Sequence, residues 1–160
     1  MTVLAIDPGT ERSAWIELDD DYGVLAFAFE DNDEVLQRVR HTGFDELALE
    51  LIQPRYGLMI GWETINTCRW VGRLEEAADA RGIPVAPLQR TEVLKHLGVA
   101  TSARKGEKKP NADSGARLAI IDRYGGPGVE HKGGPLAGVS GHVWQALAVA
   151  VTWLDTRGAA

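Results

Sequence analysis

The sequence predicts an α/β protein in which helices flank a five-stranded mixed sheet. The first third of the chain has the pattern of a three-strand meander, and strands then alternate with helical segments. The chain has 160 residues, of which 44% are hydrophobic. This length suits a single domain over residues 1–160 with a core of ordinary size.

The first three strands are predicted from apolar runs separated by turn residues. Residues 3–6 form a continuous apolar run, typical of a strand covered on both faces, and the turn Asp7-Pro8-Gly9-Thr10 follows. The second and third strands are expected at 13–18 and 24–29. The acidic turn between them is short, so we expect these two strands to form a hairpin.

Changes in hydrophobic spacing predict the remaining elements. Helical spacing covers 33–40 and 44–52, and the fourth strand is expected at 56–62, ending on Glu63. A helix at 67–81 and a short fifth strand at 83–87 follow. Further helices are expected at 91–97, 113–124 and 141–155, with loops at 98–111 and 128–138. The last helix is apolar almost all round, so we expect it to be buried, with Ser140 as its N-cap.

The composition excludes several classes of protein. The lone Cys68 excludes an internal disulfide and a cysteine-rich zinc site, and it fits a reducing compartment. No stretch approaches the ~18 consecutive apolar residues of a membrane span, and the first residues carry no basic segment. We therefore expect a soluble, cytoplasmic protein without a membrane partner.

The charge is distributed unevenly along the chain. The net charge of −6, taken by itself, argues against a nucleic-acid partner. Residues 1–63 carry 14 acidic and 4 basic side chains, whereas residues 64–160 carry 9 acidic and 13 basic ones. Four basic residues crowd one short stretch: Arg104, Lys105, Lys108 and Lys109. Such a run is usually a solvated loop, but it is also suited to contacting phosphates.

Two carboxylates are expected at matching carboxyl ends of two strands in one mixed sheet. Asp7 follows the first strand and Glu63 the predicted fourth strand, and in open α/β sheets reactive groups gather at this edge. Taken singly, Asp7 could only start a turn and Glu63 could be a surface residue. Converging carboxylates would repel each other, and a divalent cation such as Mg²⁺ or Mn²⁺ is their natural neutraliser.

The first turn of the last helix offers further polar groups to this site. His142 and Gln145 are three residues apart and therefore share a helix face. His142 could be a metal ligand or a water-activating base, or only a surface or capping group. A pair of Mg²⁺ or Mn²⁺ ions held in this way suits phosphodiester hydrolysis. The sequence has no P-loop and no nucleophile elbow, and Cys68 has no histidine partner nearby, so covalent catalysis is disfavoured.

Three motifs in order resemble the RuvC family of Holliday-junction resolvases. They are Leu4-Ala5-Ile6-Asp7-Pro8-Gly9-Thr10, Gly61-Trp62-Glu63 and the late helix with Ala146-Leu147-Ala148-Val149-Ala150. The resemblance covers nearly the whole chain, and a phage-type member is one possibility. It implies an RNase H-like fold, metal-dependent cleavage of branched DNA, and a site on Asp7, Glu63, His142 and Gln145. Gln145 stands where the family has an aspartate, which implies weaker Mg²⁺ binding, a preference for Mn²⁺ or altered activity.

The resemblance also implies partners and DNA contacts. It predicts a homodimer whose two-fold symmetry matches that of a four-way junction. The helix at 67–81 would lie near the dimer interface, with Arg69 and Trp70 stacking on a base or contacting the backbone. Trp70 could equally be a buried interface aromatic. The basic stretch 104–109 would contact phosphates, with Lys95 and Arg90 as secondary candidates.

Three other functions compete with junction resolution. Actin-like and hexokinase-like ATPases share the opening motif but need a second domain that 160 residues cannot supply. An RNase H-like nuclease could instead cut flaps, forks or RNA–DNA hybrids. A junction-binding protein that cuts poorly or no longer cuts would be consistent with Gln145.

Overall fold

The computed structural model describes residues 1–52, 60–100 and 111–157, and it contains a five-stranded mixed sheet flanked by helices. The strand order is β3-β2-β1-β4-β5. The strands are β1 (Thr2–Asp7), β2 (Arg12–Asp19), β3 (Val24–Asp31), β4 (Glu46–Leu51) and β5 (Val85–Gln89). The β1–β2 and β2–β3 pairs are antiparallel, whereas β1–β4 and β4–β5 are parallel. The predicted architecture and the predicted hairpin are confirmed.

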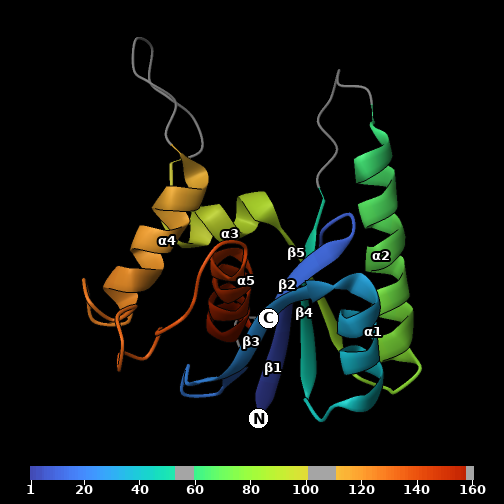
Figure 1. Ribbon diagram of the computed structural model, residues 1–160, viewed down its shortest axis with the longest axis horizontal. Helices are drawn as coiled ribbons and strands as arrows, with labels where there is room; N and C mark the ends of the chain where they lie inside the picture. The colour runs from blue at the N-terminus through green and yellow to red at the C-terminus, as the bar shows by residue number, and fades with distance from the viewer. Residues whose placement is uncertain (53–59, 101–110, 158–160) are drawn as a thin grey trace.

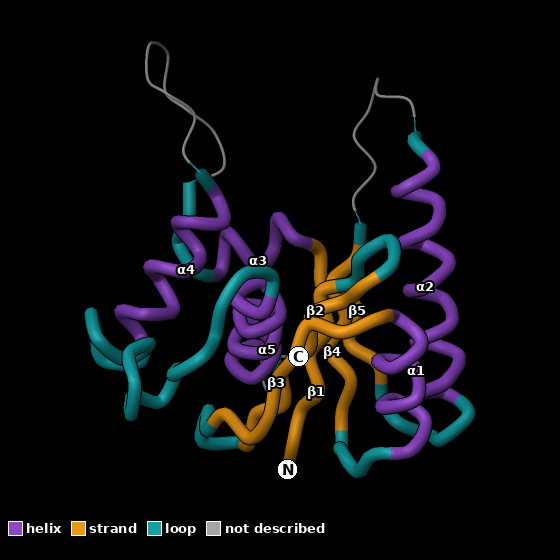
Figure 2. The backbone as a smooth tube through the Cα atoms, viewed as in Figure 1, coloured by secondary structure: helices purple, strands orange, loops and turns teal. Residues whose placement is uncertain are grey.

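Helices cover both faces of the sheet (Figure 1). On one face lie α1 (Asn32–His41) and α2 (Trp62–Asp79). On the other face α5 (Val143–Thr156) packs against the sheet, with α3 (Arg90–His96) and α4 (Ala112–Arg123) beside it. The tube view in Figure 2 shows the same layers, with the sheet between the two groups of helices.

Strand β1 contributes alternate residues to two separate cores. Val3 and Ala5 belong to the core on the α5 side, whereas Leu4 and Ile6 belong to the core beneath α1 and α2. All four are completely buried. This alternation follows from the two-residue period of a strand, and it fixes the face on which the next odd-numbered residue lies.

Helix α5 is buried along most of its length. Ten of its residues, from Val143 to Leu154, are buried between the sheet and α4. The all-round apolar pattern therefore predicted its position correctly. The predicted Ser140 cap is wrong, because the helix begins at Val143 with His142 at the N-cap position and no capping bond from a side chain.

The fourth strand differs from the prediction. Residues 46–51, expected to be helical, form β4 between β1 and β5. The expected strand 56–62 is wrong where it can be checked, because Trp62 begins α2; residues 53–59 lie outside the described part. Leu, Ala and Glu favour helices, but this segment is an interior strand buried on both faces, and tertiary packing overrides local propensity.

Two further predictions concern the basic stretch 104–109 and the absence of a membrane span. The basic residues Arg104, Lys105, Lys108 and Lys109 lie outside the described residues. Within the described part of the chain, no helix has the length and apolar character needed to cross a membrane.

Candidate active site

Asp7 and Glu50 lie side by side at the carboxyl ends of two parallel strands. Ile6 of β1 pairs with Leu49 of β4, so the residues that follow are neighbours in the same register. Ala5 and Ala48 lie on the α5 side of the sheet, and strand alternation places Asp7 and Glu50 on that side too. The two carboxylates therefore lie on the side of the sheet that α5 covers.

The turn after Asp7 is held by a network of hydrogen bonds. The Gly9 amide donates to Ser13 Oγ at 3.2 Å, and the Ser13 hydroxyl donates to Asn32 Oδ1 at 2.5 Å. The Asn32 side-chain amide donates back to the Gly9 carbonyl at 3.0 Å. A Cβ at Gly9 would lie 2.1 Å from the Arg12 carbonyl oxygen, so this position requires glycine. The network fixes the backbone that carries Asp7.

His142 reaches Asp7 from the start of α5. Its Nδ1 lies 3.6 Å from Asp7 Oδ2, and its ring stacks on Phe29 of β3 with 5.2 Å between centroids. The guanidinium of Arg12 lies over the same phenyl ring at 4.2 Å. The imidazole itself is exposed. A stacked but exposed imidazole is oriented and remains accessible to a substrate.

Arg90 joins the end of β5 to this cluster. Its Nη1 donates to Glu50 Oε1 at 3.1 Å and to Gln145 Oε1 at 3.2 Å. Its Nη2 pairs with Asp113 of α4. Arg90 follows Gln89, so the adjacent parallel strands β1, β4 and β5 each deliver one charged residue to the same edge of the sheet.

Burial and a neighbouring carboxylate disfavour the ionisation of Asp7, and burial also disfavours that of Glu50. Burial, followed by the charge of Glu50, raises the pKa of Asp7 to about 8, against the opposing effect of Arg90. Burial also raises the pKa of Glu50, although Arg90 counteracts it. At neutral pH one guanidinium is therefore too little positive charge for both carboxylates, and the site favours a cation.

Glu63, predicted as the strand-end carboxylate, does not end a strand. It lies exposed in the first turn of α2. It lines a cleft of about 610 Å³ together with Asp7, Thr10, Phe29 and His142. Glu63 is thus near the site, but Glu50 occupies the position that was assigned to it. The strand-end pair is therefore Asp7–Glu50, and a metal-binding role for Glu63, which lines the same cleft as Asp7, stays a prediction.

Of the other predicted site residues, Gln145 lies at the site, whereas Arg69, Trp70 and Lys95 lie on α2 and α3. The side-chain oxygen of Gln145 accepts a hydrogen bond from Arg90. Arg69 and Lys95 are exposed on α2 and α3. Trp70 is half-buried against the core beneath α1 and α2, and the Arg73 guanidinium lies 4.0 Å from its ring centroid.

The donor set fits a hard divalent cation. Asp7 and Glu50 supply carboxylate oxygens, and Mg²⁺ usually binds to one or two carboxylates together with substrate phosphates. Among the described residues, no group of three or more His, Cys, Asp or Glu side chains is arranged to hold a metal. The site therefore suits a cation that completes its shell with water or phosphate oxygens, not one enclosed by protein ligands.

Solved structures share this arrangement of strands and helices. The RuvC structure of Thermus thermophilus superposes with a TM-score of 0.70 at 18% identity, covering 99% of this chain and 96% of that one. This chain has the fold of RuvC. The same T. thermophilus protein in complex with a Holliday-junction substrate gives a TM-score of 0.68 at 17% identity, with the same coverage. The RNase H-like fold that the sequence motifs implied is confirmed.

Comparison of the sequence with protein families and with curated proteins found no match. Both RuvC structures named above come from T. thermophilus, and no comparison supports a phage-type subgroup.

Sequence reasoning missed Glu50 and the role of Asp113. Glu50 lay in a segment assigned to a helix, although Leu47, Leu49 and Leu51 recur at every second residue, which is a strand signal. Asp113 carries no sequence signal of its own. Its contact with Arg90 depends on how α4 packs beside α5.

Proposed function

We propose that this protein is a divalent-metal-dependent endonuclease that resolves branched DNA, with four-way junctions as its main substrate. The observation that carries the proposal is the buried Asp7–Glu50 pair at the edge of a RuvC-like sheet, facing the start of α5. RuvC of T. thermophilus has been solved with a Holliday-junction substrate, and this supports branched DNA as the partner.

Asp7 and Glu50 would hold the cation, and His142 would serve the reaction beside them. A bound Mg²⁺ or Mn²⁺ would polarise the phosphodiester and lower the pKa of attacking water. His142 would accept a proton from that water at Nδ1, the nitrogen that lies 3.6 Å from Asp7 Oδ2. Phe29 would keep the imidazole in this orientation by stacking.

A substrate panel tests the proposal directly. Four-way junction, flap, fork, duplex and RNA–DNA hybrid substrates would be incubated with the protein in Mg²⁺, in Mn²⁺ and in EDTA. We expect the junction to be cut best, with no cleavage in EDTA. Preferential cutting of flaps, forks or hybrids would instead assign the protein to another class of RNase H-like nuclease, and cleavage in EDTA would overturn the metal requirement.

A junction-binding protein with weak catalysis is the second candidate. One observation favours it: Arg90 donates hydrogen bonds to Glu50 Oε1 and to Gln145 Oε1, two oxygens that would otherwise be available to a cation. Tight junction binding without cleavage in either metal would support this candidate against the first.

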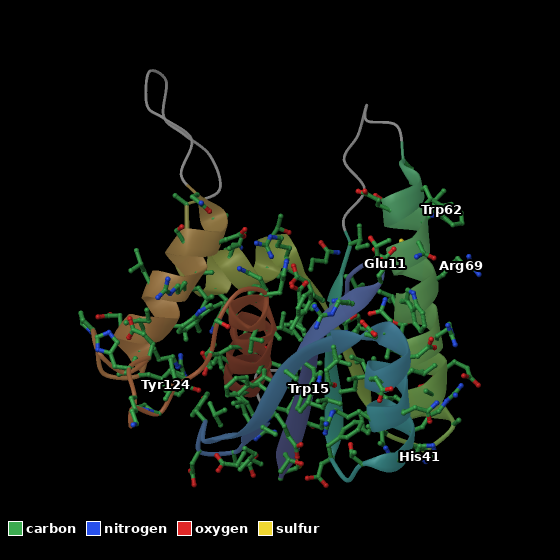
Figure 3. The ribbon with its side chains drawn as sticks, in the orientation of Figure 1. Glu11, Trp15, His41, Trp62, Arg69 and Tyr124 are labelled. Carbon is green, nitrogen blue, oxygen red and sulfur yellow. The ribbon has the colours of Figure 1, made fainter. Side chains whose placement is uncertain are left out.

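We also propose that the protein acts as a homodimer through α2. The outer face of this helix exposes Trp62 and Ile65, and Figure 3 shows Trp62 and Arg69 directed away from the sheet. With Ile60 and Cys68, Ile65 and Arg69 line an apolar groove of about 470 Å³. An exposed tryptophan beside such a groove is typical of a protein interface.

The oligomeric state can be measured by analytical ultracentrifugation. We expect the parent protein to sediment as a dimer and Trp62→Glu as a monomer. Leu118→Glu is the matched control, because Leu118 is equally exposed but lies on α4. A parent protein that is monomeric at micromolar concentration would overturn the dimer proposal.

A further inference from the structure

Arg90 is the central positive charge of the site, and its contacts are unequal. It is bonded to Glu50, Gln145 and Asp113. The Glu50 side chain is only 9% exposed, whereas that of Arg90 is 35% exposed. A buried carboxylate fixed by an arginine is costly to separate from it, so this pair is a built part of the site.

The contacts divide the site into a compensated side and an uncompensated side. On the compensated side, Arg90 lies against Glu50, Asp113 and the neutral amide of Gln145. On the other side Asp7 lies 3.6 Å from His142, which is charged only when protonated. The Asp7 side chain is only 19% exposed, and the partner in this ion pair is an imidazole, not a permanently charged guanidinium. Asp7 is therefore the carboxylate of the site whose negative charge is least balanced by a neighbouring positive charge.

We propose that Arg90 is a fixed counter-cation, so that the site binds one divalent cation beside Asp7 instead of a pair. A second divalent cation near Glu50 and Gln145 would stand next to the guanidinium and be repelled by it. This inference rests on the proposed nuclease function and specifies the metal requirement of the same site.

The identity of Gln145 agrees with this arrangement. An amide oxygen accepts the Arg90 hydrogen bond without adding negative charge. A carboxylate at 145 would add a charge that Arg90, already paired with two carboxylates, could not balance alone. The residue pair Arg90–Gln145 is thus matched to a single cation.

The number of bound metal ions tests the inference without any measurement of cleavage. Mn²⁺ would be titrated into the DNA-free full chain, with free Mn²⁺ followed by electron paramagnetic resonance and heat by calorimetry. We expect one Mn²⁺ per chain for the parent protein and for Arg90→Lys, which keeps the charge. We expect two per chain for the double variant Arg90→Gln/Gln145→Asp, with folding checked by circular dichroism.

Arg117→Gln is the matched control. It removes a guanidinium on α4 whose ion pair is with Glu130 at 3.9 Å, and the count is expected to stay at one. Two Mn²⁺ ions on the parent protein would overturn the inference. The count on the parent protein tests the inference by itself, even if the double variant does not fold. A folded double variant that still binds one ion would also overturn it.

Failure of the inference is distinguishable from failure of the proposed function. If the parent protein binds two Mn²⁺ ions and cuts junctions, the one-cation inference is wrong and the proposed function stands. If the parent protein binds no Mn²⁺, either alone or with junction DNA, the inference and the proposed metal-dependent function are both wrong.

Discussion

The two ends of α5 each lie beside a largely buried aspartate, and the surroundings shift the two pKa values in opposite directions. Asp7, beside the amino end, is 19% exposed, and Asp155, in the last turn, is 14% exposed. Burial and the charge of Glu50 raise the pKa of Asp7 to about 8. Burial also acts on Asp155, but hydrogen bonds from Tyr22, His96 and Arg123 outweigh it and lower its pKa.

The difference lies in the donors, because the exposure is nearly the same. Asp155 accepts hydrogen bonds from the Tyr22 hydroxyl at 2.7 Å and from both terminal nitrogens of Arg123 at 2.6 and 2.7 Å. His96 Nε2 lies 2.7 Å from it. These contacts join α5 to the β2–β3 hairpin, α3 and α4. The carboxyl end therefore stabilises the fold, whereas the amino end keeps an unfavourable charge arrangement of the kind found at functional sites.

The largest expected effect is on cleavage. Asp7→Asn removes the carboxylate that would hold the cation, and a bound cation supplies several kcal/mol of transition-state stabilisation. We expect junction cleavage to fall by at least about 10²–10³-fold in both Mg²⁺ and Mn²⁺. Single-turnover cleavage measures this, and a gel-shift assay should show junction binding within about twofold of the parent protein.

Asp21→Asn is the matched control for charge. It removes one carboxylate from the exposed turn between β2 and β3, which contributes no residue to the cleft lining, and should leave the rate unchanged. If Asp7→Asn cuts as well as the parent protein, the site assignment is wrong.

The second effect is a pH dependence of the free energy of unfolding, to which Asp7 and Asp155 contribute in opposite directions. Between about pH 4 and pH 8 the unfolded chain releases the Asp7 proton more readily than the folded chain. Rising pH therefore destabilises the metal-free protein across this window, by roughly 2–4 kcal/mol at neutral pH. Asp155 acts oppositely: its stabilising effect is present at neutral pH and is lost as the pH falls below its ordinary value of 3.8.

Urea unfolding in EDTA at pH 5, 6, 7 and 8 measures this dependence. We expect the free energy of unfolding of the parent protein to decrease across the series, and that of Asp7→Asn to change less. Added Mn²⁺ should restore stability to the parent protein at pH 8 but not to the variant. A parent profile that is flat or rises with pH would contradict the raised pKa of Asp7.

The sequence was informative where periodicity and burial agree. The run at 3–6, the hairpin and the apolar last helix all predicted their elements correctly, because each is buried in the way its pattern indicates. Asp7 and His142 lie beside each other as predicted, because the strand and the helix at whose ends they stand were both predicted correctly. β4 failed because its Leu, Ala and Glu residues favour a helix in isolation, and only pairing with β1 and β5 makes the segment a strand.

The charge balance of the site could not be predicted from the sequence. Arg90 was expected only as a secondary DNA contact, yet it is bonded to residues 40, 55 and 23 positions away along the chain. Such contacts depend on the packing of α4 and α5 around the sheet, and no local pattern encodes them. The same holds for Asp155, whose contact with the Tyr22 hydroxyl spans 133 positions.

The third prediction concerns the carboxyl end of α5, where Asp155 accepts several hydrogen bonds. Asp155→Asn removes the charge that accepts hydrogen bonds from Arg123 and Tyr22, and hydrogen bonds to charged groups contribute about 1.5–3 kcal/mol each. Because Arg123 remains partly exposed to water, we expect a loss of only about 1–3 kcal/mol in the free energy of unfolding at pH 7. Urea unfolding measures it, with Asp21→Asn as the control. Equal stability of Asp155→Asn and the parent protein would show that the network contributes little.

The smallest expected effect tests how the amino end of α5 orients His142. Phe29→Leu removes the aromatic face on which His142 stacks, and such a pair contributes about 0.5–1.5 kcal/mol. We therefore expect kcat/KM for junction cleavage to fall about 2–10-fold, while metal binding is unchanged. Leu25→Ala, four residues earlier on the same strand and also exposed, is the control and should not affect cleavage.

A double-mutant cycle distinguishes orientation of His142 from a direct contact of Phe29 with DNA. If Phe29 acts through His142, the change Phe29→Leu should have no further effect on the rate once His142 is replaced by alanine. An undiminished effect of Phe29→Leu in the His142→Ala background would mean that the phenyl ring contacts the substrate itself. The cleft residues would then include an aromatic DNA contact on β3, and the orientation of the imidazole would have to come from Asp7 alone.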